Sequence, residues 1–359
     1  MRALPAVDSE RFKEVVTALV AAAGLSTEFS LHTLPGAANN KVFRVDTNGS
    51  SALLKIYFQH PDDKRDRLEA EFSFSKFAWE SGIRCLAQPL GYDSENRMGL
   101  YDFVDGHQLQ PHEVAADMIG QVLDFYRELN SRKFTPGAKH LPIASEGCFS
   151  VSGHLEYVER RLKALRQLEP TSALDREAAL FIRTALSETW RDVARSVEVQ
   201  GRKLGLALNE EIAQLDRCLS PSDFGFHNAI LAPDGRLRFI DFEYAGWDDP
   251  ARLVCDFFCQ PAVPVPFEYY GPFVKGVVSG LSDAVRHRER IALLLPVYRV
   301  KWCCIFLNDF LPAGSARRSF AQGNLRDEQR KASQLEKARL ALANISLEAA
   351  GQHTRPLFT

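Results

Sequence analysis

The stretch Ser220-Pro-Ser-Asp-Phe-Gly-Phe-His-Asn-Ala-Ile-Leu-Ala-Pro-Asp-Gly-Arg-Leu-Arg-Phe-Ile-Asp-Phe-Glu243 carries the strongest fold signal in this chain. Two short apolar runs, 229–232 and 237–240, flank Pro233-Asp234-Gly235. Proline presets one turn dihedral, Asp can bond its own backbone, and Gly tolerates a positive φ, so the segment is predicted to be a β-hairpin.

The predicted hairpin brings together polar residues that are far apart in sequence. Asn228 precedes the turn and Asp241 follows it, and neighbouring strands lie about 5 Å apart, so an amide oxygen is expected beside a carboxylate. Asp223 lies on the loop that leads into the first strand. Two oxygen ligands and a nearby third carboxylate suit a hard divalent cation and a general base. The alternative is a surface hairpin with ordinary polar turn residues.

An Asp, an Asn five residues later and an Asp at the end of a returning strand form the arrangement that kinases use. The sequence motif resembles that of the aminoglycoside phosphotransferase and choline kinase family. The family pattern is roughly His-Gly-Asp-x-His-x-x-Asn, a hairpin, then Ile-Asp-(Phe/Trp)-Glu-x-Ala-x-x-Gly-Asp-Pro. Ile240-Asp-Phe-Glu-Tyr-Ala-Gly-Trp-Asp-Asp-Pro250 matches the second part closely. Pro221-Ser222 replaces the family's His-Gly, and Gly225 replaces its second His.

The resemblance implies a role for each matching residue. Asp223 would be the catalytic base, and Asn228 and Asp241 would hold Mg²⁺ on the phosphates of ATP. Glu243 and Asp248 are expected at the mouth of the same site, in contact with the substrate or as a solvated rim. A further residue, Asp256, is a lone carboxylate in an apolar helix and is expected to brace the catalytic loop through backbone N–H groups.

The first third of the chain shows strand periodicity around one helix. The turn residues predict strands at 29–34, 41–46, 52–58, 85–91 and 98–104, and a helix from Pro61-Asp62-Asp63 to about Gly82. Lys55 lies inside an apolar strand, where Lys is uncommon, so it calls for a specific partner. Glu71 on the helix is the preferred partner and Glu69 the competitor; the alternative is a Lys that faces outward at a sheet edge.

The same resemblance assigns nucleotide contacts in this region. Lys55, held by Glu71, would place the α- and β-phosphates of ATP. The loop with Gly36 and Asn40 would cover the phosphates, although a plain hairpin is the alternative. Phe103 and Val104 lie in the segment that resembles the family's linker between lobes, whose backbone pairs with adenine.

The remainder of the chain is predicted to be mainly helical. Helical spacing appears at 113–133, 151–168, 173–197 and 325–349, and the last of these is expected to be a surface helix or a dimer contact. The Pro- and Gly-containing segment 134–149 is predicted to be a loop, either a substrate-facing flap or a solvated spacer.

Composition restricts the classes of function. The 359 residues are 45% hydrophobic and 25% charged, with 44 Lys and Arg against 46 Asp and Glu, so nothing favours nucleic-acid binding. No apolar leader and no run of about eighteen apolar residues is present, so we expect a cytoplasmic protein without a membrane contact. The seven scattered Cys are expected to be free, buried thiols.

Together these patterns predict an α+β, two-lobed protein-kinase-like fold. Its parts would be an N-terminal helix (1–26), a small antiparallel-sheet nucleotide lobe with one helix (27–105) and a larger, mainly helical lobe (106–359). The resemblance implies an ATP- and Mg²⁺-dependent kinase acting on a hydroxyl of a small polar molecule, with a sugar, an amino alcohol and an aminoglycoside all open as acceptor. The alternative is a catalytically weak, kinase-like nucleotide-binding or regulatory protein, and a homodimer is open in either case.

Overall fold

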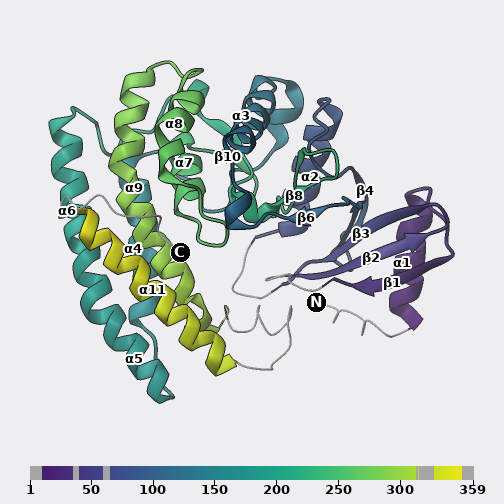
Figure 1. Cartoon of the computed structure of the whole chain (residues 1–359), viewed down its shortest axis with the longest axis horizontal. Helices are drawn as coiled ribbons and strands as arrows, with labels where there is room; N and C mark the ends of the chain where they lie inside the picture. The colour runs from purple at the N-terminus through teal and green to yellow at the C-terminus, as the bar shows by residue number, and fades with distance from the viewer. Residues whose placement is uncertain (1–9, 35–39, 60–64, 313, 315–326, 350–359) are drawn as a thin grey trace.

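The computed structural model describes residues 10–34, 40–59, 65–312, 314 and 327–349. It has a smaller half built on a sheet and a larger helical half (Figure 1). This is the α+β kinase-like fold that the sequence predicts. The predicted start of the first-lobe helix at Pro61 and the loop residue Gly36 lie outside the described residues.

A five-stranded antiparallel sheet forms the smaller half, with the order β1-β2-β3-β5-β4. Gly49, with φ 93°, makes the tight turn between the second and third strands. Helix α1 (Glu10–Ala22) packs its buried Phe12 and Val16 into the apolar core of this sheet. The strands are β1 (Phe29–Thr33), β2 (Lys41–Thr47), β3 (Ser50–Ile56), β4 (Pro89–Asp93) and β5 (Met98–Asp102).

The first-lobe helix and the fourth strand begin later than their sequence patterns suggest. Helix α2 spans Arg67–Glu80, and the side chain of Asp66 caps it by accepting from the backbone N–H of Glu69. The residues before β4 pair elsewhere: Cys85 accepts a backbone hydrogen bond of 2.7 Å from Phe239 in the hairpin. The hairpin therefore takes the first part of the predicted fourth strand away from the sheet.

The predicted hairpin is present at the boundary of the two halves. Its strands are β8 (Ala229–Leu231) and β9 (Leu237–Phe239), and Gly235 in the turn has φ 76°. A short strand, β6 (His107–Gln108), pairs with β8 at one edge. Two further short strands, β7 (Cys218–Ser220) and β10 (Gly246–Asp248), pair with each other on either side of the hairpin in sequence.

The helical half surrounds α9, a 23-residue helix that is buried along most of its length. Its length and composition would suffice to cross a membrane, but 67% of the most apolar window in that stretch is buried inside the protein. We therefore describe it as the central core helix. The helices of this half are α3 (Ala116–Ser131), α4 (Val151–Arg166), α5 (Ala173–Phe181), α6 (Ser187–Lys203), α7 (Pro250–Cys259), α8 (Tyr270–Val278), α9 (Ala284–Phe306) and α11 (Asp327–Ala349).

Short helical turns complete this half. The predicted helix at 173–197 is divided into α5 and α6 by a π-helical turn, η3 (Ile182–Leu186). The 3₁₀ turns are η1 (Pro111–Glu113), η2 (Pro136–His140), η4 (Gln214–Asp216), η5 (Phe226–Asn228), η6 (Phe267–Tyr269) and η7 (Leu307–Phe310).

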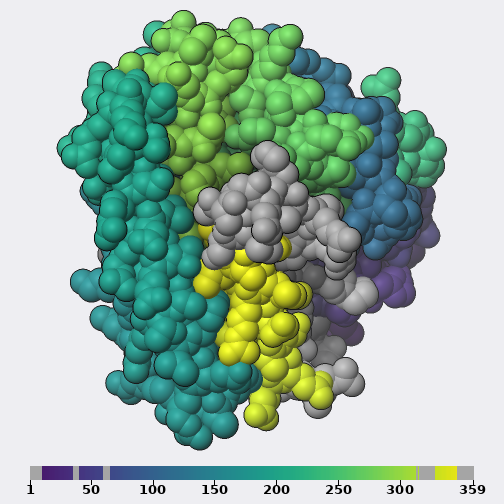
Figure 2. All heavy atoms as spheres, turned by 60° about the vertical axis from the view of Figure 1, so that its left-hand side comes forward, coloured from purple at the N-terminus to yellow at the C-terminus, as the bar shows by residue number. Residues whose placement is uncertain are grey.

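Helix α11 uses its apolar residues inside the molecule. Leu335, Ala338 and Leu342 belong to the main core of the helical half. Figure 2 shows α11 in yellow on the surface, next to the teal helices of this half. Helix α11 is therefore a surface helix, as one of the two sequence alternatives predicted, and its apolar side packs into the core. All seven Cys are free thiols, as expected, and five of them are buried, whereas Cys85 and Cys148 are half-buried.

Candidate active site

A buried ionic cluster joins the two halves of the molecule. The Nζ of Lys55 on β3 lies 2.6 Å from Oε2 of Glu71 on α2, and it also contacts Oδ1 of Asp241 beyond the hairpin. Glu69, the competitor, is exposed in the first turn of α2. The structure thus brings together three residues, the first and last of which, Lys55 and Asp241, are 186 positions apart in sequence.

Two tyrosines lie behind this cluster, and sequence reasoning missed them. The hydroxyl of Tyr57 donates to Oε2 of Glu71 at 2.8 Å and lies 2.8 Å from the hydroxyl of Tyr101. Tyr57 follows Lys55 by two residues, and residues so spaced along an extended chain share one face. That spacing was the available signal for a side chain that orients Glu71.

Mutual proximity and burial shift the protonation equilibria of the cluster. Burial raises the pKa of Glu71 to about 7, against the opposing attraction of Lys55. Burial also raises the pKa of Asp241, and the carboxylates of Glu243 and Asp223 raise it further. Burial lowers the pKa of Lys55, but the Asp241 and Glu71 carboxylates outweigh this and raise it well above the usual value. The ammonium is therefore retained at neutral pH.

Glu243 belongs to this cluster, away from the substrate mouth where it was expected. It is 1% exposed, and its Oε2 accepts from Nδ2 of Asn40 at 2.6 Å. Asn40 in turn accepts from the backbone N–H of Phe58 at 3.1 Å, so this amide connects both halves. One ligand oxygen each of Glu71, Asp241 and Glu243 lie within 4.8 Å of one another, an arrangement that could hold a cation.

The loop between β7 and β8 holds Asp223 at the partly exposed edge of the site. The Nε2 of His227 lies 3.3 Å from Oδ1 of Asp223. The Nδ2 of Asn228 donates to the backbone carbonyl of Asp223 at 2.9 Å, and the carbonyl of Asn228 accepts from the N–H of Ile240, next to Asp241, at 3.0 Å. Although burial raises the pKa of Asp223, the neighbouring His227 outweighs it and holds the pKa below its usual value. Asp223 is therefore ionised and able to accept a proton at neutral pH.

Ser222 adopts a strained backbone conformation beside Asp223. Its φ is 69°, in the left-handed region that glycine enters at little cost. Two hydrogen bonds hold it there: its N–H donates to Oγ of Ser220 at 2.9 Å, and its own Oγ accepts from Nη2 of Arg252 at 2.6 Å. The serine that replaces the family's glycine thus has a specific partner in a buried guanidinium.

This conformation predicts an unusual order of stability at position 222. Both Ser222→Ala and Ser222→Gly remove the hydrogen bond from Arg252, but only Ala keeps the left-handed strain. We expect the Gly variant to be more stable than the Ala variant by about 0.5–1 kcal/mol, measured by urea unfolding. An Ala variant at least as stable as the Gly variant would contradict the strained geometry.

Asp248 and Asp249 are buried structural residues. Asp248 is 0% exposed and contacts Nη1 of Arg252 at 3.2 Å, so its expected place at the substrate mouth is wrong. Asp249 caps α7 by accepting from the N–H of Ala251 at 2.8 Å, as its sequence position before Pro250 predicts. It also accepts from Nε2 of His154 and pairs with Arg290.

Burial raises the pKa of Asp248 to about 6, which predicts a specific pH dependence of stability. Between about pH 4 and pH 6 the folded protein keeps a proton on this carboxyl that the unfolded chain releases, so the contribution to stability falls as the pH rises. The difference in free energy of unfolding, wild type minus Asp248→Asn, should fall by on the order of 2–3 kcal/mol from pH 4 to pH 7. Parallel pH profiles of the two proteins in urea unfolding would contradict it, and Asp192→Asn on the exposed face of α6 is the control.

Asp256 makes different contacts from those expected. Its carboxylate binds Nζ of Lys301 at 2.6 and 2.7 Å and accepts from Nε1 of Trp302 at 3.1 Å, whereas a bond to a catalytic-loop N–H was predicted. It reaches the loop through another side chain, since Nε of Arg252 lies 3.5 Å from it and Arg252 bonds Ser222. Arg252 lies four residues from both Asp248 and Asp256, a helical spacing that was the available sequence signal.

Two further predicted site residues, Phe103 and Val104, occupy the linker between the halves. The N–H of Phe103 donates to the carbonyl of Ser51 at 3.3 Å, and the Arg44 guanidinium lies 4.3 Å from the centre of the Phe103 ring. Val104 is half-buried in the segment that leads from β5 to β6. Gly36 belongs to the residues outside the description.

The segment 134–149, predicted to be a loop, contains the short turn η2 and is anchored by backbone hydrogen bonds. The N–H of Ala144 donates to the carbonyl of Trp247 at 2.9 Å, and the N–H of Trp247 donates to the carbonyl of Pro142 at 2.8 Å. A Cβ on Gly246 would lie 2.3 Å from the Pro142 oxygen, so only glycine permits this close approach. The segment therefore forms a fixed wall beside the residues that follow the hairpin.

Asn130 is bonded to the strand that leads into the Asp223 loop. Its Oδ1 accepts from the N–H of Leu219 at 2.8 Å, and its Nδ2 donates to the carbonyl of the same residue at 3.1 Å. This pair of bonds fixes β7, the strand that leads to Asp223.

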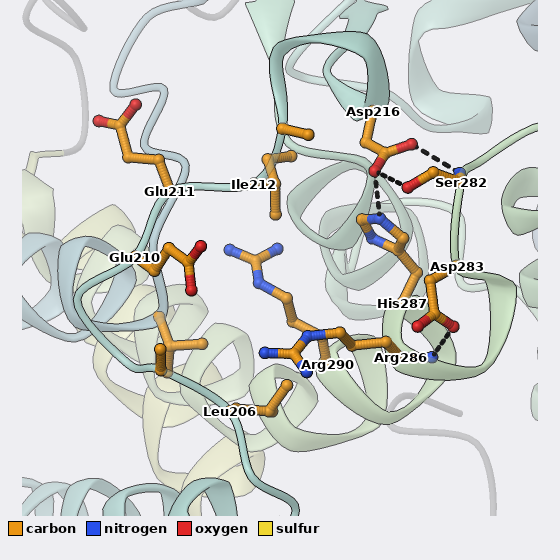
Figure 3. A pocket seen from close by; sticks show the side chains of 13 residues that line it. Leu206, Glu210, Glu211, Ile212, Asp216, Ser282, Asp283, Arg286, His287 and Arg290 are labelled. Atoms are coloured by element: carbon orange, nitrogen blue, oxygen red, sulfur yellow. Dashed lines mark hydrogen bonds and ion pairs between the residues drawn. The ribbon is translucent and has the colours of Figure 1, made fainter.

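A cavity of about 240 Å³ lies at the start of α9, and its walls contain none of the predicted site residues. Figure 3 shows the guanidinium groups of Arg286 and Arg290 directed into it, with Glu210 on the opposite wall. Groups of both charges line it, and Arg290 is already paired with Asp249. The Lys55–Asp241 cluster and the Asp223 loop lie outside this cavity.

Known structures share this architecture at low sequence identity. A spectinomycin phosphotransferase in complex with ADP and spectinomycin matches with a TM-score of 0.63 and 12% identity, over 95% of this chain and 99% of that chain. A choline kinase from Cryptosporidium parvum matches with a TM-score of 0.56 and 12% identity, over 98% of both chains. An ethanolamine kinase from Plasmodium vivax matches with a TM-score of 0.58 and 14% identity, over 94% of this chain and 90% of that chain.

A comparison with curated proteins gives no significant match. The family model described as the phosphotransferase enzyme family matches residues 30–289, well over half of the chain, from β1 to the first turns of α9. The matched region includes the Lys55–Asp241 cluster and the whole Asp223 loop. This protein therefore belongs to the phosphotransferase enzyme family.

Proposed function

We propose that this protein is a small-molecule kinase that transfers a phosphoryl group from ATP to a hydroxyl group of a small polar molecule. The observation that carries the proposal is the buried contact of Lys55 with both Glu71 and Asp241, next to the loop that presents Asp223. A solved relative in complex with ADP supports a nucleotide as the donor.

The donor set beside the loop fits a hard divalent cation. Asp241 offers carboxylate oxygens, and the Asn228 side chain, whose Nδ2 donates to the Asp223 carbonyl, has its Oδ1 as a further oxygen ligand. Asn228 and Asp241 would therefore hold Mg²⁺. When bound, Mg²⁺ neutralises the negative charge of the phosphates.

The protein's own residues would position the reactants and move one proton. The Lys55 ammonium, held by Glu71, supplies a fixed positive charge for the donor phosphates. The carboxylate of Asp223 orients the acceptor hydroxyl and takes its proton as the phosphoryl group is transferred. Asn40 is bonded to Glu243 across the two halves. This contact would hold the backbone around Asn40 in position beside the donor phosphates.

A phosphorylation screen tests this proposal and searches for the acceptor. Purified protein is incubated with Mg-ATP and a panel of sugars, amino alcohols and aminoglycosides, and ADP release and phosphorylated product are measured. We expect one chemical class to be phosphorylated and turnover to require Mg²⁺. Mg²⁺-independent ATP binding without turnover on any hydroxyl compound would instead favour the catalytically weak, nucleotide-binding alternative.

A further inference from the structure

The catalytic loop contains an imidazole at a position that the family pattern does not provide. The family's second His would stand at position 225, where this chain has glycine, and His227 follows two residues later. The φ of Gly225 is 174°, an extended value that any residue adopts, so the backbone does not require glycine there. The reason for glycine must therefore lie in the space around it.

That space is filled by the His227 ring. A Cβ added at Gly225 would lie 2.7 Å from Nδ1 and 2.9 Å from Cε1 of His227, closer than real Cβ contacts allow. It would also lie 2.9 Å from Cγ of Gln260. A side chain at position 225 and the observed place of the His227 ring therefore exclude each other.

The opposite wall cannot move aside. Gln260 is 2% exposed, and its Oε1 accepts from the backbone N–H groups of Ala262 and Val263 at 3.0 and 3.2 Å. Its Nε2 donates to the carbonyl of Val263. These three bonds fix the Gln260 side chain at the end of α7, so Gly225 is what leaves room for the imidazole.

In this place the ring contacts the base. The Nε2 of His227 lies 3.3 Å from Oδ1 of Asp223. Its other nitrogen, Nδ1, has no hydrogen bond to the residues that the structure describes, so the Asp223 carboxylate is the polar contact that fixes the ring. Asn228 bonds the backbone carbonyl of Asp223, and of the two side chains His227 has the larger effect in holding the pKa of the Asp223 carboxyl below its usual value, with Asn228 the smaller.

We propose that His227 is the positioning residue for Asp223, and that Gly225 is retained to give its imidazole room. The inference rests on the proposed kinase function and adds to it the group that orients the base. An N–H held at Oδ1 restricts the rotation of the carboxylate and directs the second oxygen at the acceptor hydroxyl. A misplacement of a reacting group by about 1 Å can cost on the order of 10²-fold in rate.

The first experiment separates a positioning role from packing. Mg-ATP turnover, with water as the acceptor until the screen identifies another, is measured for wild type, His227→Phe and His227→Gln. Phe keeps the ring volume without the N–H, and Gln restores a terminal N–H donor. We expect Phe to lower kcat about 10- to 100-fold with the KM for Mg-ATP and the Tm near wild type, and Gln to recover most of the loss. His140→Phe, at an exposed position in η2, is the matched control.

Equal losses in the Phe and Gln variants, or a change in KM and Tm in place of kcat, would overturn the positioning role. An inactive wild-type protein would be a failure of the proposed function itself, so the two failures are distinguishable.

A stability measurement tests, without reference to activity, whether the His227 ring occupies the space beside Gly225. Gly225→Ala should lower the Tm by several degrees in the wild-type background. In the His227→Ala background at least half of this loss should disappear, because the ring that meets the new Cβ is gone and only Gln260 remains. An equal loss in both backgrounds would show that His227 does not occupy the space beside Gly225, and would overturn the inference.

Discussion

Asp223→Asn should lower kcat for phosphoryl transfer about 10²- to 10⁴-fold, the range that a positioned general base contributes. Asn keeps the shape of the side chain next to the His227 ring, which lies 3.3 Å from Oδ1 in the wild type, but it cannot take the proton of the acceptor hydroxyl. The Lys55–Glu71 contact, where the phosphates are expected, is unchanged. Steady-state kinetics and direct titration with Mg-ATP should therefore show a large loss in kcat with nucleotide affinity within a few-fold of wild type.

A matched control lies in the turn of the hairpin that follows the Asp223 loop. Asp234 is an exposed turn residue, so Asp234→Asn makes the same chemical change away from the loop and should leave kcat within about twofold. If Asp223→Asn and Asp234→Asn behaved alike, Asp223 would not be the base. If Asp223→Asn lost nucleotide binding together with kcat, the residue would act in binding or folding.

The second large effect is expected on stability, for Asp256→Ala. The carboxylate is 2% exposed and binds the 5% exposed Lys301 at 2.6 and 2.7 Å, with Arg252 at 3.5 Å and Trp302 at 3.1 Å. Removing one partner of a buried ion pair leaves the other charge without compensation, at a cost of about 3–5 kcal/mol. This is a large part of the stability of a typical protein, so urea unfolding should show a clearly lower midpoint.

A double variant separates the uncompensated charge from a packing defect. Replacing the pair together, as Asp256→Leu with Lys301→Met, removes both buried charges and should recover part of the stability. Recovery is incomplete because Arg252 and Trp302 also lose a partner. Asp192→Ala on the exposed face of α6 should stay within about 0.5 kcal/mol of wild type. An Asp256→Ala protein within 1 kcal/mol of wild type would contradict the buried ion pair.

Local sequence signals were sufficient where structure is determined by neighbours along the chain. The turn residues Pro233-Asp234-Gly235 predicted the hairpin, and its strands pair across that turn. Asp249 followed by Pro250 predicted the cap and first residue of α7. The periodicities of the first third predicted the antiparallel strands of the five-stranded sheet, although β4 and α2 begin later, because the hairpin pairs with Cys85 and Asp66 caps the helix.

A contact between two side chains was predictable where one of them is of a type that is uncommon in its surroundings. Lys55 in an apolar strand called for a partner, and helical geometry chose Glu71 over Glu69. Roles that depend on which way a carboxylate points were not predictable. Asp248 and Glu243 lie among similar neighbours in sequence, yet one pairs with Arg252 on α7 and the other with Asn40 in the smaller half.

The sequence by itself determined the fold class, the hairpin flanked by Asn228 and Asp241, and the family, because these depend on short-range backbone preferences and on the order of a few residues. The tertiary structure alone decided the partners of the buried charges. A buried charge needs compensation, and several residues of the right sign are always available in sequence. Which of them lies within about 3 Å depends on the packing of elements that are tens to hundreds of residues apart, as it does for Lys55 with Asp241 and for Asp256 with Lys301.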